Sequence, residues 1–162
     1  MAGTGNTDSG ELELGRLETA LGFLLLAGWR YANFYYAKHF KDVDITPAGY
    51  GMLTLVSGNP GCSVGDVGRA MGIAPNNIAR LVDRLHERGL VEKRVSAEDA
   101  RSRSLQITAA GNDMLRLLDE RHAAYEKEFY AQIGQDRLDA LRALLRPFAR
   151  GSPTEMGDRD VL

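Results

Sequence analysis

The pattern of hydrophobic and polar positions is clearest in the middle of the chain. Four apolar residues there recur at the spacing of one helical face: Ile78, Leu81, Val82 and Leu85. Pro75 suits the first position of a helix, where its missing N–H is not needed, and Gly89 suits the position after the last turn. The pattern therefore predicts an amphipathic helix over residues 75–88.

A shorter helix is predicted immediately before it. Ser63 is a favourable N-cap, and Asp66 follows three residues later, as in a capping box. Gly72 suits the end of this helix, and its narrow apolar stripe consists of Val64, Val67 and Met71. Helices over residues 63–72 and 75–88, joined by so short a turn, predict a helix-turn-helix.

A charged hairpin is predicted next. Residues 90–95 and 104–108 alternate between apolar and polar side chains, as two short strands do. The loop between these strands and its base carry Arg94, Asp99, Arg101 and Arg103. Arginines at such positions suit DNA phosphates or a narrow minor groove, and Asp99 is placed to pair with Arg101 or to orient it. The alternative interpretation is an ordinary charged hairpin.

The polar face of the helix at residues 75–88 carries residue types that read DNA bases. Its members are Asn76, Asn77, Arg80 and Arg84. Asparagine bonds adenine bidentately and arginine does the same to guanine, which suits a helix in a major groove with a wing beside it. The alternative is a solvated polar face, which every surface helix has. Together with the hairpin, the pattern favours sequence-specific binding of double-stranded DNA.

The order of short motifs over residues 45–112 resembles the MarR family of bacterial winged-helix regulators. The matching positions are Ile45-Thr46-Pro47, Asp66-Val67, Met71-Gly72-Ile73, Leu81-Val82-Asp83-Arg84-Leu85, Arg88-Gly89-Leu90-Val91, Arg94, Asp99-Ala100-Arg101-Ser102 and Ile107-Thr108-Ala109-Ala110-Gly111. The resemblance implies a mainly α fold with a small β-hairpin wing (α+β), in which the N- and C-terminal helices form a dimerisation region. One departure is Ala74-Pro75-Asn76-Asn77, where such proteins are often rich in serine and threonine; it bears on the operator sequence.

The distribution of charge agrees with a local contact with DNA. The chain has 162 residues, enough for one domain with a substantial core, and a net charge of −2. Residues 64–105 carry eight Lys and Arg against six Asp and Glu, a net charge of +2. The remainder has a net charge of −4. Positive charge is therefore concentrated over the predicted helix-turn-helix and hairpin.

Helices are also predicted on both sides of this segment. Long helices are expected over about residues 11–40 and 109–132, and shorter ones over about 47–57 and 136–148. The predicted organisation is a disordered N-terminus over residues 1–10, a helical dimerisation region over 11–45 and 109–150, a winged helix-turn-helix domain over 46–108 and a flexible tail over 151–162.

The terminal segments carry more apolar side chains than one small winged domain can cover. These are Leu12, Leu14, Leu17, Leu21, Leu24 and Leu25, and Leu138, Leu141, Leu144, Leu145 and Phe148. A helix that reads a palindromic site also needs a two-fold partner. In the family that the chain resembles, the terminal helices interlock to form a dimer. We therefore expect a homodimer; the alternative is packing within one chain.

Aromatic residues are concentrated between positions 29 and 50. Seven of the twelve lie there: Trp29, Tyr31, Phe34, Tyr35, Tyr36, Phe40 and Tyr50. Tyrosine and tryptophan suit a planar organic molecule, although aromatic residues also dominate ordinary cores. Relatives in the resembling family commonly bind aromatic acids or phenols, and a smaller set responds to acyl-CoA thioesters. The predicted effector-binding residues are Tyr31, Tyr35, His39 and Tyr50, with Arg30 as the partner of an anionic group.

An effector at such a site would act through the spacing of two recognition helices. In a dimer these helices must lie about one DNA turn apart, ~34–36 Å. A ligand between the dimer helices and the winged lobe would change that spacing, to the extent that it binds the two states unequally. Repression that is relieved by a ligand is therefore the expected mode of regulation.

Other classes of function find less support. Cys62 is the single cysteine, so an internal disulfide is excluded and a redox-sensing regulator is an alternative. A structural thiol is expected instead, because reactive cysteines of the resembling family lie near the N-terminal helix. His39, His86 and His122 lack metal-ligand spacing, and no hydrolase or nucleotide-binding motif occurs. We expect no metal, no cofactor and no enzymatic activity.

Two further expectations concern partners and location. A winged helix that binds only protein is the second alternative, although such a module does not need asparagine and arginine at the positions named above. Residues 23–29 are apolar but fall short of the ~20 residues that span a membrane. The start of the chain lacks the basic segment of a secretory signal. The expected location is the cytoplasm, without contact with a membrane.

Overall fold

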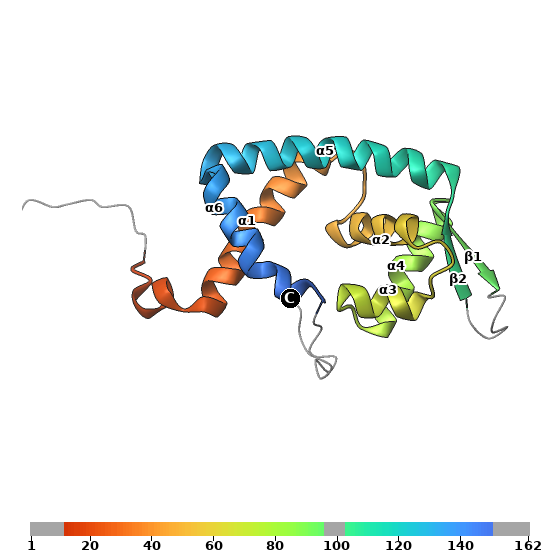
Figure 1. Cartoon of the computed structure of the whole chain (residues 1–162), viewed down its shortest axis with the longest axis horizontal. Coiled ribbons are helices and arrows are strands. Elements are labelled where there is room, and N and C mark those ends of the chain that lie inside the picture. Colours follow the sequence, from red (N-terminus) through yellow and green to blue (C-terminus); the bar gives the residue numbers. More distant parts are fainter. Residues whose placement is uncertain (1–11, 96–102, 151–162) are drawn as a thin grey trace, which may run out of the picture. The chain divides into compact units, whose positions relative to one another are not determined.

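The computed structural model describes residues 12–95 and 103–150, which are mainly helical with one two-stranded sheet (Figure 1). The predicted fold class, mainly α with a β-hairpin wing, is confirmed. The chain divides after Tyr35 into two compact units. Residues 1–10 and 151–162, predicted as a disordered N-terminus and a flexible tail, lie outside the described residues.

The first unit contains the 3-10 helix η1 (Gly15–Thr19) and most of α1 (Leu21–Phe40). The prediction of one continuous helix from about residue 11 is therefore wrong at its start. Gly15 lies in the left-handed region with a φ of 55°, and Ala20 is extended with a ψ of 109°. Because glycine and threonine are poor helix formers, the apolar pattern alone does not hold an α-helix through this stretch.

The second unit contains the end of α1 and all the later elements. In chain order these are α2 (Pro47–Gly58), α3 (Val64–Met71), α4 (Pro75–Glu87), β1 (Val91–Val95), β2 (Arg103–Ile107), α5 (Ala109–Ile133), α6 (Gln135–Leu145) and η2 (Arg146–Arg150). The predicted helix-turn-helix and hairpin are confirmed. The last helix ends at Leu145 instead of the predicted Phe148, because Pro147 lacks an N–H and its ring crowds the preceding turn.

The boundaries of α3 and α4 follow the predicted caps. The Ser63 hydroxyl accepts from the Asp66 N–H at 3.1 Å, and the Asp66 carboxylate accepts from the Ser63 N–H at 3.2 Å, which completes a capping box. Gly72 and Gly89 follow the two helices with φ values of 63° and 69°. Glycine adopts this left-handed conformation without steric cost, so both helices end where the sequence predicts.

The hydrophobic core of the second unit draws on the five helices from α1 to α5 and on both strands. Its most deeply buried side chains are Met52, Leu53, Val56, Ile78, Val82, Val91, Leu105 and Leu118. The apolar stripe predicted for residues 75–88 is entirely buried. Burial of one aliphatic side chain stabilises the fold by about 1.5–3 kcal/mol, so the stripe determines which face of α4 remains outside.

The two strands form an antiparallel hairpin directly after α4. Val91 pairs with Ile107, and Val95 pairs with Arg103. An isolated bridge between Ser63 and Ser104 joins β2 to the start of α3. The hairpin is therefore held against the helix-turn-helix on the side of α3.

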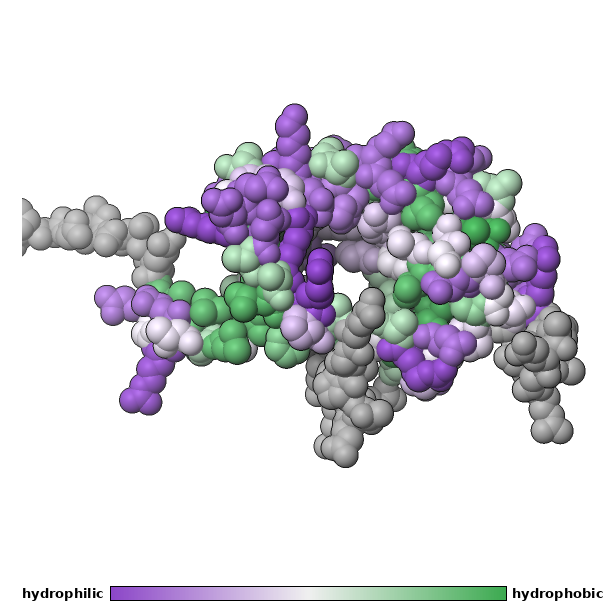
Figure 2. All heavy atoms as spheres, viewed as in Figure 1, coloured by the Kyte–Doolittle hydropathy of each residue, from purple (hydrophilic) through white to green (hydrophobic). Residues whose placement is uncertain are grey.

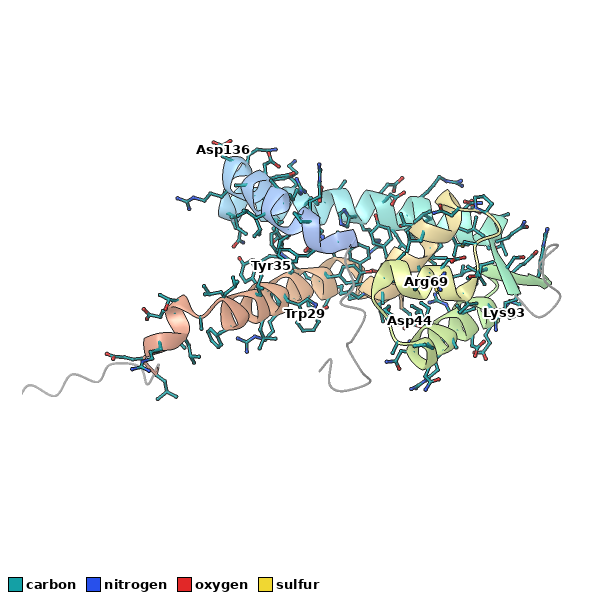
Figure 3. The ribbon with its side chains drawn as sticks, turned by 60° about the horizontal axis from the view of Figure 1, so that its bottom comes forward. Trp29, Tyr35, Asp44, Arg69, Lys93 and Asp136 are labelled. Atoms are coloured by element: carbon teal, nitrogen blue, oxygen red, sulfur yellow. The ribbon has the colours of Figure 1, made fainter. Side chains whose placement is uncertain are left out.

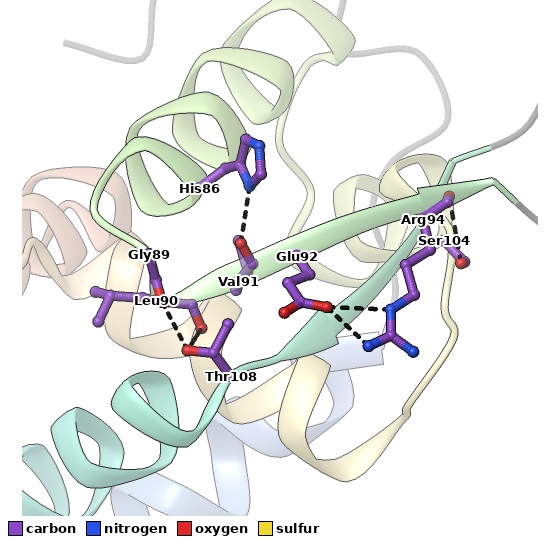
Figure 4. A network of polar contacts seen from close by, with 8 residues as sticks. All are labelled: His86, Gly89, Leu90, Val91, Glu92, Arg94, Ser104 and Thr108. Atoms are coloured by element: carbon purple, nitrogen blue, oxygen red, sulfur yellow. Dashed lines mark hydrogen bonds and ion pairs between the residues drawn. The ribbon is translucent and has the colours of Figure 1, made fainter.

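The start of α5 is joined closely to the turn between α4 and β1. Thr108 caps α5 by accepting from the Gly111 N–H at 2.9 Å, and its hydroxyl donates to the Gly89 carbonyl at 2.6 Å (Figure 4). A Cβ at Gly111 would lie 2.1 Å from the Leu90 carbonyl oxygen. A side chain at position 111 is therefore excluded unless the backbone moves.

Candidate nucleic-acid interface and aromatic cluster

The outward face of α4 carries the polar residues predicted to read bases. Asn76, Asn77, Arg80 and Arg84 are all exposed. Pro75 begins the helix, which places Asn76 and Asn77 in its first turn. Because the apolar stripe is buried, these amide and guanidinium groups remain available for hydrogen bonds to base edges and phosphates.

Two contacts hold α4 against β1. Lys93 of β1, labelled in Figure 3, forms an ion pair with Asp83 of α4. Nδ1 of His86 lies 2.9 Å from the Val91 carbonyl oxygen, to which it donates (Figure 4). The orientation of the outward face of α4 is therefore coupled to the hairpin.

The predicted wing residues have different environments. Arg94 is exposed, and its Nε and Nη2 donate to one carboxylate oxygen of Glu92 at 3.1 and 2.8 Å (Figure 4). An exposed ion pair of this kind contributes only about 0–1 kcal/mol, so Arg94 can exchange it for a phosphate at little cost. Arg103 is the first residue of β2. Asp99 and Arg101, together with the contact predicted between them, lie outside the described residues.

Three of the predicted effector-binding residues lie in the first unit. Tyr31 and Tyr35 are one turn apart on α1, with ring centroids 4.9 Å apart. The Tyr31 hydroxyl donates to that of Tyr35 at 3.3 Å, and Phe34 packs edge-on against Tyr35. Arg30, beside Tyr31 in the chain, is exposed. The structure thus combines two of the three predicted residues in one aromatic surface on α1.

The other two predicted residues belong to an aromatic cluster in the second unit. The Tyr50 ring lies 5.4 Å from the His122 ring, and His122 lies 5.5 Å from Tyr125. The His39 ring lies 6.2 Å from Tyr125. The end of α1, the start of α2 and the middle of α5 therefore contribute to one cluster.

Two carboxylates that the sequence analysis missed anchor this cluster. Asp119 accepts from the Tyr50 hydroxyl at 2.8 Å. Glu128 lies 2.7 Å from Nε2 of His39 and accepts from Lys38 at 2.6 Å. The signal that points to them is a recurrence at every third position of α5: Asp119, His122, Tyr125 and Glu128.

The environment of the cluster shifts the ionisation of its members. The Tyr36 ring also belongs to the cluster, with its centroid 6.5 Å from that of Tyr125, and burial raises the pKa of Tyr36 to about 12. Burial, and then the hydrogen bond to Asp119, raises the pKa of Tyr50 as well. The hydrogen bond from Lys38, followed by that with His39, lowers the pKa of Glu128. Near neutral pH the cluster therefore presents protonated phenols and aromatic faces beside an ionised carboxylate.

The environment of Cys62 favours a neutral thiol. Cys62 is half-buried, and burial followed by the charge of Asp66 raises the pKa of its thiol. Because the thiolate is the reactive form, this setting argues against a redox-sensing role. Within the described part of the chain, no three histidine, cysteine or acidic residues are grouped so as to hold a metal ion.

The terminal segments expose large apolar side chains. Of the residues predicted to form the dimer interface, those exposed are Leu12, Leu14, Leu17, Leu21, Leu24 and Leu25 toward the N-terminus, and Leu141, Leu144, Leu145 and Phe148 toward the C-terminus. In Figure 2, hydrophobic residues gather over the N-terminal part of α1. Leu138 differs from the prediction, because it is buried within this chain. Among the described residues, no helix has both the length and the apolar character needed to cross a membrane.

Comparison with known proteins agrees with this geometry. The MarR family profile matches residues 43–102. A putative transcriptional regulatory protein for the hcr operon of Thauera aromatica is 30% identical over 146 residues, which cover 90% of this chain and 88% of that protein.

Solved structures also match over most of the chain. The repressor CouR bound to a 23-mer DNA duplex aligns with a TM-score of 0.81 and 30% identity, covering 86% of this chain and 99% of that one. The PcaV regulator of Streptomyces coelicolor, in complex with its natural ligand, aligns with a TM-score of 0.76 and 25% identity, covering 89% and 99%. The order of motifs, the winged helix-turn-helix and these relatives agree, and the chain belongs to the MarR family of transcriptional regulators.

Proposed function

We propose that this protein binds a palindromic operator as a homodimer, represses transcription and is released from DNA by an aromatic effector. The observation that carries the proposal is the outward face of α4. Its buried stripe leaves two asparagines and two arginines exposed on one helix, beside a hairpin whose Arg94 is also exposed. These groups suit base edges and phosphates, and CouR, of similar fold, is a repressor bound to a DNA duplex.

The homodimer is supported by the exposed apolar side chains of the terminal helices. Phe148, Leu144 and Leu21 are 75, 71 and 70% exposed in the single chain. Large apolar side chains exposed in this number mark an interaction site, and a second copy related by two-fold symmetry would cover equivalent faces at once. Two recognition helices, one from each copy, would then face successive turns of a palindromic operator.

The class of effector is supported by the two aromatic groups. One contains Tyr31 and Tyr35 beside Arg30, and the other contains Tyr50 and His39. Planar rings stack on such surfaces, and hydroxyl and imidazole groups offer hydrogen bonds to a phenol or a carboxyl group. CouR has also been solved with p-coumaroyl-CoA, at 28% identity and a TM-score of 0.79. The proposed effector is therefore an aromatic or phenolic acid, or its CoA thioester.

Binding of purified protein to DNA from its own upstream region tests the proposal as a whole. The measurement is made at ~150 mM salt with random DNA as competitor, because electrostatic binding is uninformative at low salt. The compounds added are hydroxycinnamic and hydroxybenzoic acids and their CoA thioesters. Release by one compound at a coupling of about 1–3 kcal/mol, several-fold to a hundredfold in affinity, is expected. Binding no tighter than to random DNA at every salt concentration would refute autoregulation.

Two substitutions separate the roles of the helix and the wing. Asn77→Ala is expected to lower affinity for the operator by about 1–3 kcal/mol while random DNA is bound as before, because it removes a base contact. Arg101→Ala is expected to weaken binding to both DNAs alike, because it removes a phosphate contact. The slope of log affinity against log salt concentration should become shallower by about 1. An equal loss on both DNAs for Asn77→Ala would count against base reading by this residue.

A further inference from the structure

We propose that Arg88 and Arg121 form a clamp on the linker between α1 and α2, and that Arg88 positions the recognition helix α4 through this clamp. The linker comprises residues 41–46. The clamp is argued from contacts within the second unit alone. Its consequence for DNA reading rests on the function proposed above.

One side of the clamp comes from α5. The Arg121 guanidinium donates from Nη1 and Nη2 to the two carboxylate oxygens of Asp42, at 2.5 and 2.7 Å. Nη1 also donates to the His39 carbonyl at 2.9 Å. The hydrogen bond from Arg121 lowers the pKa of Asp42, and the same bond raises the pKa of Arg121. A planar guanidinium with both carboxylate oxygens as acceptors fixes orientation as well as distance.

The other side of the clamp comes from the end of the recognition helix. Arg88 is the C-cap residue of α4. Its guanidinium donates to the Asp44 carbonyl at 2.5 Å and to the Val43 carbonyl at 3.3 Å. The side chains of Val43 and Ile45 are buried on either side of Asp44, so these carbonyls belong to an anchored stretch of backbone.

The linker is held in a conformation that the chain does not adopt freely. Asp44, labelled in Figure 3, has a φ of 44° in the left-handed region. Such a residue costs about 1–3 kcal/mol and persists where surrounding contacts determine it. The linker and α4 also line a cleft of about 270 Å³ that includes Thr46, Leu81 and Arg84. Packing is incomplete at that point, and the Arg88 guanidinium bridges the two segments.

A displacement of α5 or of the end of α1 therefore reaches α4 along a continuous set of contacts. Arg121 ties α5 to Asp42, the linker connects Asp42 to Asp44, and Arg88 ties Asp44 to the end of α4. The reading of base edges depends on the orientation of α4, whereas attraction to phosphates depends mainly on charge. Loss of Arg88 should therefore affect specific binding more than non-specific binding.

The experiment compares Arg88→Gln, Arg121→Gln and the double variant in the full chain. Two quantities are measured: amide hydrogen exchange in α4, and affinity for a duplex that the unmodified protein selects from a randomised library, against random DNA. Arg88→Gln is expected to speed exchange near the end of α4 and to weaken binding to the selected duplex on the order of tenfold, with less than about twofold change for random DNA. Arg121→Gln is expected to act in the same direction, and to add nothing once Arg88 is replaced.

Two control variants accompany these measurements. Arg116→Gln removes the same charge from an exposed site of α5 and should leave both quantities unchanged. Arg88→Lys keeps the charge and one donor to the linker, and should recover part of the effect; it also serves if Arg88→Gln fails to fold.

The proposal is overturned if both variants lower the unfolding midpoint but leave discrimination and exchange in α4 unchanged. It is also overturned if Arg121→Gln alters α4 equally with and without Arg88. A protein that prefers no duplex in the selection would refute the proposed function, and exchange in α4 would still decide whether the clamp exists.

Discussion

The winged lobe (α2 to β2) and the terminal helices differ in how deeply their apolar side chains are buried. In the lobe, Met52, Leu53 and Leu105 are fully buried within one chain. In the terminal helices, Leu21 of α1 remains 70% exposed and Leu144 of α6 remains 71% exposed. The lobe therefore completes its core alone, whereas the terminal helices need something to cover them. Since a monomer rarely leaves so many large apolar side chains uncovered, the difference supports the proposed homodimer.

Polar side chains are also arranged in two different ways, on the outward face of α4 and between the linker and α5. On the outward face of α4, asparagine and arginine side chains are exposed to solvent. Between the linker and α5, Arg121 is held by Asp42 and by the His39 carbonyl. The first arrangement leaves hydrogen-bonding capacity for a partner, and the second uses it to fix one element against another. Arginine is thus left available for the proposed recognition of DNA in one place and holds the linker in the other.

The largest expected effect is on the core of the lobe. Leu53→Ala is expected to lower the free energy of unfolding by about 2–5 kcal/mol, because it leaves a cavity at a fully buried position. Leu12→Ala, at a position that is 90% exposed in the single chain, should change the free energy of unfolding of the monomer by no more than about 0.5 kcal/mol. Both are measured by urea unfolding at a protein concentration below the dissociation constant of the dimer. Similar losses for the two variants would contradict the contrast between a complete core and an uncovered face.

A smaller effect is expected at the exposed apolar face of α6. Leu144→Asp should raise the dissociation constant of the dimer about tenfold or more, because a charge replaces a side chain whose burial contributes about 1.5–3 kcal/mol. Ala143→Asp is the matched control, since one residue along a helix turns it by about 100° away from the apolar face. Analytical ultracentrifugation at several concentrations measures both. Equal weakening by the two variants would remove α6 from the interface.

The smallest expected effect is a loss of folding stability at acid pH. Hydrogen bonds from Arg121, Ser63 and Lys38 lower the pKa of Asp42, Asp66 and Glu128 respectively, in each case as the largest cause. The stabilisation from a lowered pKa is fully present above the unfolded value, about 4, and is lost as pH falls through the folded value. Unfolding measured by urea from pH 6 down to about pH 3 should therefore show falling stability. In Asp42→Asn the fall should be shallower; an unchanged slope would exclude Asp42 as a contributor.

Much of the fold was predictable because its signals are local. The capping box at Ser63, the glycines at positions 72 and 89 and the period of the apolar stripe in α4 act within a few residues of each other. The break at Ala20 and the early end of α6 were not predicted. In both places the apolar pattern continues and predicts a longer helix. The residues that interrupt the α-helix are Gly15 in one case and Pro147 in the other.

The candidate site was predictable only in part. The exposed residues of α4 follow from periodicity, because the residues that are not in the stripe must face outward. Asp119 and Glu128 lie 69 and 89 residues from Tyr50 and His39, the residues they contact. The spacing of three residues in α5 makes Asp119 a neighbour of His122, and Glu128 a neighbour of Tyr125. It does not say which residues of other helices these two carboxylates contact.

The sequence by itself determined the family, the helix-turn-helix and the face of α4 that stays outside, because short-range spacing and capping carry that information. The tertiary structure alone decided that Arg88 and Arg121 hold the same linker, that Asp119 and Glu128 anchor the aromatic cluster and that Leu138 is buried. Each of these contacts joins residues far apart in the chain. Their partners are chosen by how the helices pack, and packing depends on the shapes of many side chains at once.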